Sequence, residues 1–400
     1  MAWLSLMKRN RIVAVFLLLF VAAQSYGQQK QNKVDFSGYV KNMSTFVGIG
    51  DSLWYENLIH NRLNLKWYAS DNLTGYVEVR NRILLGDFVK NLHPVYGQII
   101  DANNDYFTLS TNLIENENVV FNTMIDRIYL QWNKNDWEIT AGRQRVNWGI
   151  NLAWNPNDLF NAYSFFDFDY EERRGSDAVR IKYYTGVTSS VEVAAKMAKE
   201  VDRFVAAGIW KVNKWDYDFQ FLGGLAHGDV AVGTGWAGNI GLAGFKGEVT
   251  YLRPFATTSI NSSYNQLFIG SLSVDYSFKS SLYLNGSILY NSKNAVDPDF
   301  GLVSFASPST SDFTMRDLSN YRWSTFVQSA YQISPLISAS LSTMVFPGTN
   351  ALFINPAVSI SLSQDIDLGL FGQLYYDEDA VTGDYSSLNP SGFLRFKWSF

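Results

Sequence analysis

The chain has 400 residues, of which 16% are aromatic, 17% are charged and none is cysteine. Its formal net charge is −5, and loss of the three basic residues within positions 1–27 would bring it to −8. This acidic balance argues against a nucleic-acid partner, which calls for a basic surface. The lack of cysteine excludes a disulfide framework and thiolate chemistry.

Residues 1–27 have the pattern of a cleaved secretory signal peptide. Three basic residues precede an apolar run at 12–23, and the small residues Ser25 and Gly27 stand at −3 and −1 relative to a cut after Gly27. A membrane-spanning helix is the alternative, but it needs about 20 apolar residues, and this run has only about 12. We expect 28–400 to be a single domain. No second apolar run reaches 18 residues, so any membrane crossing would use strands.

From residue 34 onward, apolar and polar side chains alternate with the period of a β-strand. In one example, Leu63 and Leu65 face away from Arg62 and Asn64. Most such segments are long enough for a tilted strand to cross a bilayer, which takes about 9 to 11 residues. We predict a further, weak strand in the glycine-rich region 228–241, which makes eighteen strands, with sixteen as the alternative count. The seventeen clearer segments are 34–48, 62–68, 73–85, 127–132, 137–146, 179–183, 189–197, 203–212, 215–227, 242–252, 266–278, 281–291, 321–333, 336–345, 357–363, 366–376 and 391–400.

The links between these segments alternate between short turns and longer loops, as in outer-membrane barrels. All nine prolines fall in the predicted links, where a residue without a backbone N–H does not interrupt a sheet ladder. This arrangement predicts an all-β protein, a transmembrane antiparallel β-barrel with both chain ends on the periplasmic side. The longer loops are 86–122, 147–177, 253–265, 292–320, 346–356 and 377–390.

A soluble β-sandwich or propeller would also show alternating strands. Aromatic residues near the strand ends favour the barrel, because they suit the aromatic girdles found at membrane interfaces. These residues are Trp67, Trp132, Trp137, Tyr183, Trp215, Tyr251, Tyr290, Trp323, Tyr376 and Trp398.

The last predicted strand places Leu394, Phe396, Trp398 and Phe400 on one face. This ending resembles the C-terminal signal of Gram-negative outer-membrane proteins. The resemblance implies that the barrel-insertion machinery recognises Phe396, Trp398 and Phe400. It also implies an outer-membrane location, with lipid and lipopolysaccharide around the barrel.

The polar strand faces predict a lumen with thirteen basic and nine acidic side chains. In a water-filled pore, a surplus of fixed positive charge favours anions and disfavours cations. The sequence therefore predicts a channel for passive diffusion of small hydrophilic solutes, with a mild anion preference. In the alternative, many of these groups pair across neighbouring strands and only hold the wall together. The basic residues expected to line the pore include Arg80, Arg82, Arg127, Arg180 and Lys182.

Three motifs follow one another closely: AGRQRVNWG at 141–149, NPNDLFN at 155–161 and EERRG at 171–175. This succession resembles porin-like outer-membrane families of the alginate-export and capsule-assembly type. The resemblance is specific over this stretch and only architectural elsewhere. It implies a large barrel with loops that bend into the lumen, and it raises export or surface anchoring of a polysaccharide as an alternative function.

Strict alternation from Trp137 would turn Arg143 and Arg145 toward lipid, at a cost of about 2 to 4 kcal/mol each near the bilayer centre. Either Gly142 forms a bulge that turns both inward, or both lie above the hydrocarbon. With a bulge, the two arginines would face basic residues of adjacent strands, and loop acids would neutralise them and fix a constriction. The alternative is a salt-bridged loop that caps the pore without selecting a sugar or a carboxylate. The loop residues expected to take part are Asp158, Asp167, Glu171, Glu172, Arg173 and Arg174.

Enzymatic signals are weak. Gly233–Gly238 matches a dinucleotide-binding pattern by letter, but no helix is predicted after it. His60, His93 and His227 are the only histidines and lack metal-ligand spacing, and no G-x-S-x-G motif is present. We expect no catalytic residue, no cofactor and no metal. A barrel enzyme is the least favoured of the three functions.

Overall fold

The structure is a computed structural model. It describes residues 33–102, 105–163, 165, 172–255, 266–292, 313–319, 321–348, 351–378 and 385–400. The predicted signal segment 1–27 lies outside the described residues, so its cleavage stays a prediction. Phe36–Phe400 form one compact unit. None of the helices in the described parts of the chain is long and apolar enough to cross a membrane.

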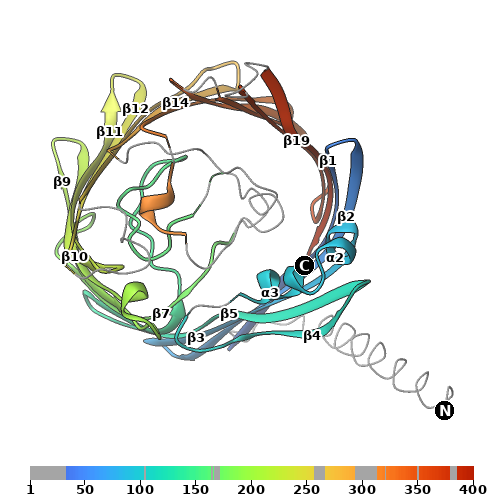
Figure 1. Ribbon diagram of the computed structural model, residues 1–400. Coiled ribbons are helices and arrows are strands. Elements are labelled where there is room, and N and C mark those ends of the chain that lie inside the picture. Colours follow the sequence, from blue (N-terminus) through green and yellow to red (C-terminus); the bar gives the residue numbers. More distant parts are fainter. Residues whose placement is uncertain are drawn as a thin grey trace, which may run out of the picture. The chain divides into compact units, whose positions relative to one another are not determined.

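Antiparallel strands form a closed ring around a lumen (Figure 1). Neighbours in sequence pair with each other, and the ring closes because β1 pairs with β19 as well as with β2. The strands of the described residues are β1 (Val34–Ile49), β2 (Ser52–Ser70), β3 (Leu73–Gly86), β4 (Ser110–Asn116), β5 (Val119–Lys134), β6 (Trp137–Gln144), β7 (Ser176–Tyr184), β8 (Ser190–Lys196), β9 (Val205–Lys214), β10 (Tyr217–Ala226), β11 (Asp229–Ile240), β12 (Ala243–Pro254), β13 (Leu267–Ser277), β14 (Leu282–Asn291), β15 (Trp323–Ser334), β16 (Ile337–Phe346), β17 (Ala351–Ser363), β18 (Ile366–Glu378) and β19 (Tyr385–Ser399).

β4 does not form a separate strand of the ring. It pairs with β5 over Val119–Met124, while β6 pairs with the other half of the same β5 edge, over Ile128–Lys134. The opposite edge of β5 pairs with β3 along its whole length. The ring therefore has eighteen strands, as predicted, and the weak strand expected in 228–241 is β11. β4 was not predicted, because it lies inside the long link assigned to 86–122.

The outer surface of the barrel is apolar. Residues such as Leu130, Val232 and Val274 are exposed on it, with exposed fractions of 48 to 57%, while their strand neighbours point inward. Seven of the predicted interfacial aromatics are also exposed, namely Trp67, Trp132, Trp137, Tyr183, Trp215, Tyr251 and Trp323. An apolar band with aromatics near the strand ends is the surface that a transmembrane barrel presents to lipid.

The seam of the barrel contains the terminal aromatic residue. Gly38 and Phe400 exchange two backbone hydrogen bonds of 2.9 Å, and the register runs from Tyr39↔Ser399 to Val47↔Ser391. The Phe400 ring lies 6.0 Å from that of Phe36 and 5.3 Å from that of Trp398.

Short helices occur where the chain leaves the wall. They are α2 (Asp87–Asn91), α3 (Val95–Asp101), η1 (Val201–Arg203) and η2 (Met315–Asp317). α2 and α3 bury Phe88, Val89, Tyr96 and Ile100 against strand residues that include Leu84. This cluster fixes the part of the predicted loop 86–122 that precedes β4.

The prediction that every proline lies in a link is wrong for three of the seven prolines that the structure describes; Pro298 and Pro308 lie outside the described residues. Pro254 is the last residue of β12, and Pro356 and Pro390 lie within β17 and β19. The pairs between β17 and β18 pass from Ile354 directly to Ala357, and the register shifts beside Pro390. Pro356 and Pro390 thus occupy places where the ladder to β18 is interrupted, and a missing N–H is tolerated there.

Candidate functional site

The segment after β6 enters the lumen, as Figure 1 shows for the teal and green trace inside the ring, together with the orange helix η2. We call the described residues 145–163 the luminal segment. Several of its side chains are almost completely buried, with exposed fractions of 0% for Val146, 1% for Trp148 and Leu159, and 4% for Phe160. The luminal segment is therefore packed against the wall.

A carboxylate of the wall holds the luminal segment. Glu248 of β12 is completely buried and accepts three backbone hydrogen bonds, from Ile150 at 2.6 Å, Asn151 at 3.1 Å and Asn157 at 2.8 Å. Hydrogen bonds to a charged acceptor are stronger than neutral ones, at about 1.5 to 3 kcal/mol each. Glu248 is thus the principal anchor between the segment and the barrel.

Further polar contacts extend this anchorage around the lumen. The Trp148 indole donates to Glu192 of β8 at 2.7 Å, and Gln220 of β10 donates to the Trp148 carbonyl at 3.1 Å. On the other side, the hydroxyl of Ser271 on β13 donates to the Trp154 carbonyl at 3.1 Å. The segment therefore bridges strands that lie on different parts of the ring.

The glycine-rich strand β11 makes room for the luminal segment. A Cβ atom on Gly233 would lie 2.7 Å from Oδ1 of Asn157, and one on Gly235 would lie 3.0 Å from its Nδ2. Asn157 donates to the Thr234 carbonyl at 3.0 Å. The dinucleotide-like stretch Gly233–Gly238 is therefore part of a strand, and its inward glycines allow close approach of the segment.

The short helix η2 is fixed to the wall by a buried ion pair. Arg316 forms a two-point contact with Asp229 of β11, at 2.8 Å from Nε and 2.6 Å from Nη2. Both side chains are at most 2% exposed. Two-point arginine–carboxylate geometry adds orientation to the attraction, so η2 has a defined place beside the luminal segment.

Three arginines meet around a cavity of about 140 Å³. Arg127 of β5, Arg180 of β7 and Arg145 of the luminal segment line it together with neutral polar residues. Arg180 pairs with Glu138 and Arg127 lies 3.5 Å from Glu78, whereas Arg145 has no ion pair within 4 Å among the described residues. We call this place the arginine cavity. It brings together three of the basic side chains that were predicted to line the pore.

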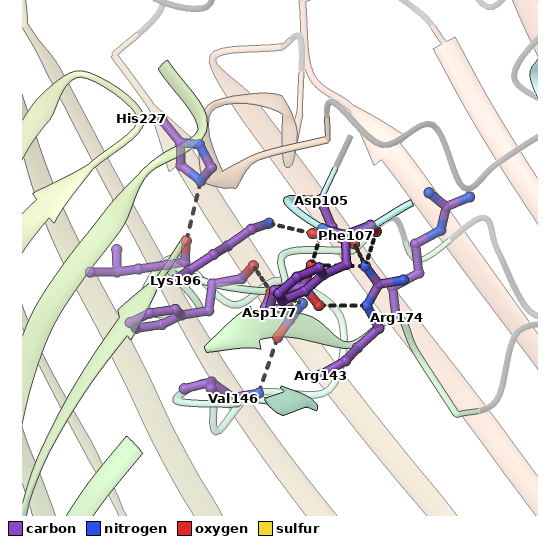
Figure 2. Close-up of polar contacts among 12 residues, drawn as sticks. Asp105, Phe107, Arg143, Val146, Arg174, Asp177, Lys196 and His227 are labelled. Atoms are coloured by element: carbon purple, nitrogen blue, oxygen red, sulfur yellow. Dashed lines mark hydrogen bonds and ion pairs between the residues drawn. The ribbon is translucent and has the colours of Figure 1, made fainter. Parts of the chain in front are cut away.

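Arg143 does not line the arginine cavity. Its guanidinium contacts Asp177 at 2.7 and 2.9 Å and the Phe107 carbonyl at 2.6 Å (Figure 2). Asp105 lies 3.8 Å from the same guanidinium and 3.2 Å from Lys196. The expectation that Arg143 and Arg145 face Arg127 together is therefore corrected: Arg143 is enclosed by carboxylates from the neighbouring strand and from the loop before β4.

Gly142 has a φ of 121°, but β6 pairs with β5 and β7 around it without a register shift, so the predicted bulge is not observed. A Cβ atom at this position would lie 2.3 Å from the carbonyl oxygen of Ile128. Only glycine adopts this conformation without strain. The distorted end of β6 sends the two arginines to different partners.

The other predicted site residues have structural contacts. On the strands, Arg80 lies 3.2 Å from the sulfur of Met124, Arg82 donates to the Ile100 carbonyl at 2.7 Å, and Lys182 lies 4.4 Å from the centre of the Tyr184 ring. In the loop, Glu172 accepts from the Tyr39 hydroxyl at 3.2 Å, and its backbone carbonyl accepts from Arg127. Arg173 lies 3.9 Å from the centre of the Tyr163 ring, and Arg174 donates to the Ala102 carbonyl at 3.4 Å. Asp167 and Glu171 lie outside the described residues.

The sequence interpretation did not assign roles to several residues that organise the site. Glu248 and Glu192 were counted only as luminal charge, and Asp126 and Arg316 were not considered. Arg62 binds both Asp126, at 2.8 Å, and Glu78. For Glu248, the sequence did carry a signal: its carboxylate faces inward from a strand that contains small residues. Such a pattern indicates a close neighbour in the lumen.

The charge of Asp158 should respond to pH. Burial raises the pKa of this carboxyl to about 6, against the effect of the nearby Arg145 guanidinium. Below about pH 6 Asp158 becomes neutral while Arg145 keeps its charge, so the lumen becomes more positive. We expect the anion preference measured by reversal potential to increase between pH 7 and pH 5. The variant Asp158→Asn should have the larger preference already at pH 7 and a weaker pH response; an unaltered response would contradict this assignment.

Among the described residues, no group of three His, Asp or Glu side chains could hold a metal ion. His227 is held between the carbonyls of Leu159 and Asp202, and burial lowers its pKa to about 4. The neutral imidazole has a single N–H and therefore donates to one of these two carbonyls, which supports the packing of the luminal segment.

Neither a scan of protein-family models nor a search of curated proteins gives a match. Solved structures match over almost the whole fold. OccK11 (OpdR) of Pseudomonas aeruginosa has a TM-score of 0.56 at 8% identity, over 92% of this chain and 96% of that chain. OccAB4 and OccAB3 of Acinetobacter baumannii have TM-scores of 0.56 and 0.55 at 9% identity, over 93% and 92% of this chain and 99% of each of theirs.

At such low identity the likeness concerns the fold alone. The matched structures are outer-membrane porins. The chain thus has the fold of that class, an antiparallel transmembrane barrel of eighteen strands, here with a luminal segment anchored on buried acidic residues.

Proposed function

We propose that the chain is an outer-membrane channel for passive diffusion of small hydrophilic solutes, with a mild preference for anions. The arginine cavity carries this proposal, since it places three guanidiniums around one open space beside the luminal segment. The porin fold of the matched structures supports the same function. Fixed positive charge in a confined aqueous path lowers the entry cost for anions.

The anion preference should depend on Arg145 more than on the other luminal arginines. Arg62, Arg143 and Arg180 have carboxylate partners, whereas Arg145 has none within 4 Å among the described residues. Removing one unit charge about 4 Å from a permeating ion in water changes its energy by about 1 kcal/mol, or roughly fivefold in permeability. The effect on an anion and on a cation has opposite sign, so the difference between them is about 2 kcal/mol. We expect Arg145→Gln to reduce the anion-to-cation permeability ratio by up to roughly thirtyfold.

Reversal potentials in a salt gradient across planar bilayers measure this ratio. Arg203→Gln is the matched control, because Arg203 pairs at 3.4 Å with the exposed Glu200 and lies outside the arginine cavity. A clear cation preference of the unmodified protein would overturn the proposed selectivity.

The proposal includes how the chain reaches the outer membrane. We infer that residues 1–27 are removed before the barrel is inserted, and that Phe396, Trp398 and Phe400 form the signal read by the insertion machinery. The exposed fractions of Phe396 and Phe400 are 43% and 39%, which supports an outward, accessible face of β19. Lipid and lipopolysaccharide would then surround the apolar band.

A polysaccharide-export or surface-anchoring barrel is the second candidate. The packed luminal segment favours it, because such a segment restricts the free cross-section of the pore, and the motifs at 141–175 resemble families of that type. Liposome swelling with sugars of graded size separates the two functions. A diffusion channel admits the smallest sugars rapidly, whereas an export or anchoring barrel closed by its segment admits little. No catalytic role is proposed.

A further inference from the structure

A second cavity, of about 260 Å³, lies between the luminal segment and the wall formed by β15–β18. It shares no lining residue with the arginine cavity. Its lining combines aromatic side chains with neutral hydrogen-bonding groups, and among the described residues Arg173 is its one charged member. The two cavities therefore differ in chemistry, and we call the larger one the neutral cavity.

The aromatic side of the neutral cavity is held in place. Asn155 donates to the Tyr163 hydroxyl at 3.3 Å, and the Arg173 guanidinium lies 3.9 Å from the centre of the Tyr163 ring. The Phe165 ring packs at 65° against Phe326, with centroids 4.7 Å apart. Fixed rings offer flat apolar faces to a ligand without an ordering cost on binding.

The opposite side of the cavity offers groups that suit hydroxyls. Gln328 donates its amide to Ser342 at 3.0 Å, and Asn355 donates to the Gly372 carbonyl at 2.6 Å. These bonds orient both side chains, and each keeps a carbonyl oxygen that can accept from a ligand. The hydroxyl of Ser340 can both donate and accept. A ligand with several hydroxyl groups and an apolar ring face matches this arrangement.

We propose that the neutral cavity is a binding subsite for a neutral pyranose sugar. The inference rests on the proposed function and deepens it by naming a class of solute. The volume of about 260 Å³ lies just below the range of about 300 to 1,000 Å³ of drug-sized ligand sites, which suits a single ring. A small carboxylate would instead find its counter-charges in the arginine cavity.

Glucose is the probe for this subsite. Isothermal titration calorimetry on the detergent-solubilised full chain should give a dissociation constant in the millimolar range, about −4 kcal/mol. In planar bilayers, glucose should interrupt the single-channel current over the same concentrations. Conductance without glucose binding below about 100 mM would overturn the subsite and leave the channel intact. Glucose binding without any conductance would overturn the channel.

Two variants locate the subsite. Gln328→Met removes the amide while keeping the length of the side chain, and Phe165→Leu keeps apolar packing while removing the flat ring. Each should weaken glucose binding about tenfold, or about 1.4 kcal/mol. Gln332→Met is the matched control on the same strand. The Gln332 amide donates to the carbonyls of Ser334 and Ile337 at the turn and does not line the described neutral cavity, so this variant should leave binding unchanged. If all three variants bound glucose as tightly as the unmodified chain, the glucose site would not lie in the neutral cavity.

Discussion

Glu248→Gln is expected to release the luminal segment and to raise the open-channel conductance. Ile150 and Asn151 donate their backbone N–H groups to one carboxylate oxygen of Glu248, and Asn157 donates to the other. An amide keeps one acceptor oxygen, so its NH2 group must face at least one backbone N–H. The segment would therefore lose at least one bond to a charged group, about 1.5 to 3 kcal/mol, and its other bonds would go to a neutral oxygen. Single-channel recording should show larger and noisier currents than those of the unmodified protein.

Asp275→Asn provides the matched control for this prediction. Asp275 lies on β13, next to the strand of Glu248, and pairs with Lys246 at 3.3 Å without contact to the luminal segment. The control removes the same charge from the same part of the wall and should keep the quiet, smaller current. If both variants behave alike, loss of luminal charge and not release of the segment explains the result.

Arg143→Ala is expected to destabilise the barrel and to change its selectivity little. Arg143 and Asp177 are 2% and 3% exposed, and removal of one partner of a buried ion pair costs about 3 to 5 kcal/mol because the other charge stays buried. Urea unfolding of the protein reconstituted in vesicles, followed by tryptophan fluorescence, measures this loss. The expected behaviour is the opposite of that of Arg145→Gln, which should alter selectivity and leave stability almost unchanged.

The double variant Arg143→Met with Asp177→Leu tests the reason for this loss. When both charges are replaced by apolar groups, no buried charge is left uncompensated, so the double variant should be more stable than Arg143→Ala. Lys246→Ala breaks a partly exposed pair and should cost no more than about 1 kcal/mol. If Arg143→Ala were as stable as Lys246→Ala, the assignment of Arg143 and Asp177 as a buried ion pair would be wrong.

The ring of strands was predictable because each strand separates lipid from the lumen. Successive residues, such as Arg62 and Leu63, point to opposite faces of the wall, one toward the lumen and one toward lipid. The sequence shows this as alternation of polar and apolar residues. The weak strand β11 was found only through the count of links, since its inward positions include Gly233 and Gly235. Their small size reflects contact with Asn157, a long-range feature that alternation does not report.

The candidate site was predictable only in part. The prediction that basic residues of β5 and β7 meet an arginine from the motif at 141–149 describes the arginine cavity. Alternation could not assign Arg143, because its partners Asp105 and Asp177 are 38 and 34 positions away in the chain, and Gly142 beside it has a positive φ. The same holds for Glu248, whose three donors come from residues about 90 to 100 positions earlier.

β4 was not predicted for a related reason. It lies beside half of β5 only, and its exposed residues Leu113 and Ile114 do not alternate with polar neighbours. A strand outside the ring has no lumen on one side, so the two-sided pattern that marks the other strands does not arise. Its presence depends on pairing with β5, which a local pattern does not reveal.

The pairing of the first strand with the last one has a consequence for biogenesis. Tyr39 and Ser399 are partners in the register, so ring closure joins positions that are separated by almost the entire polypeptide. Contacts of such long range form slowly, because the chain loses conformational entropy on closing the loop before the stabilising contacts are made. Until β19 reaches it, β1 would present an open edge that is prone to aggregate. Conditions that delay the pairing of β1 with β19 should therefore increase aggregation of the chain.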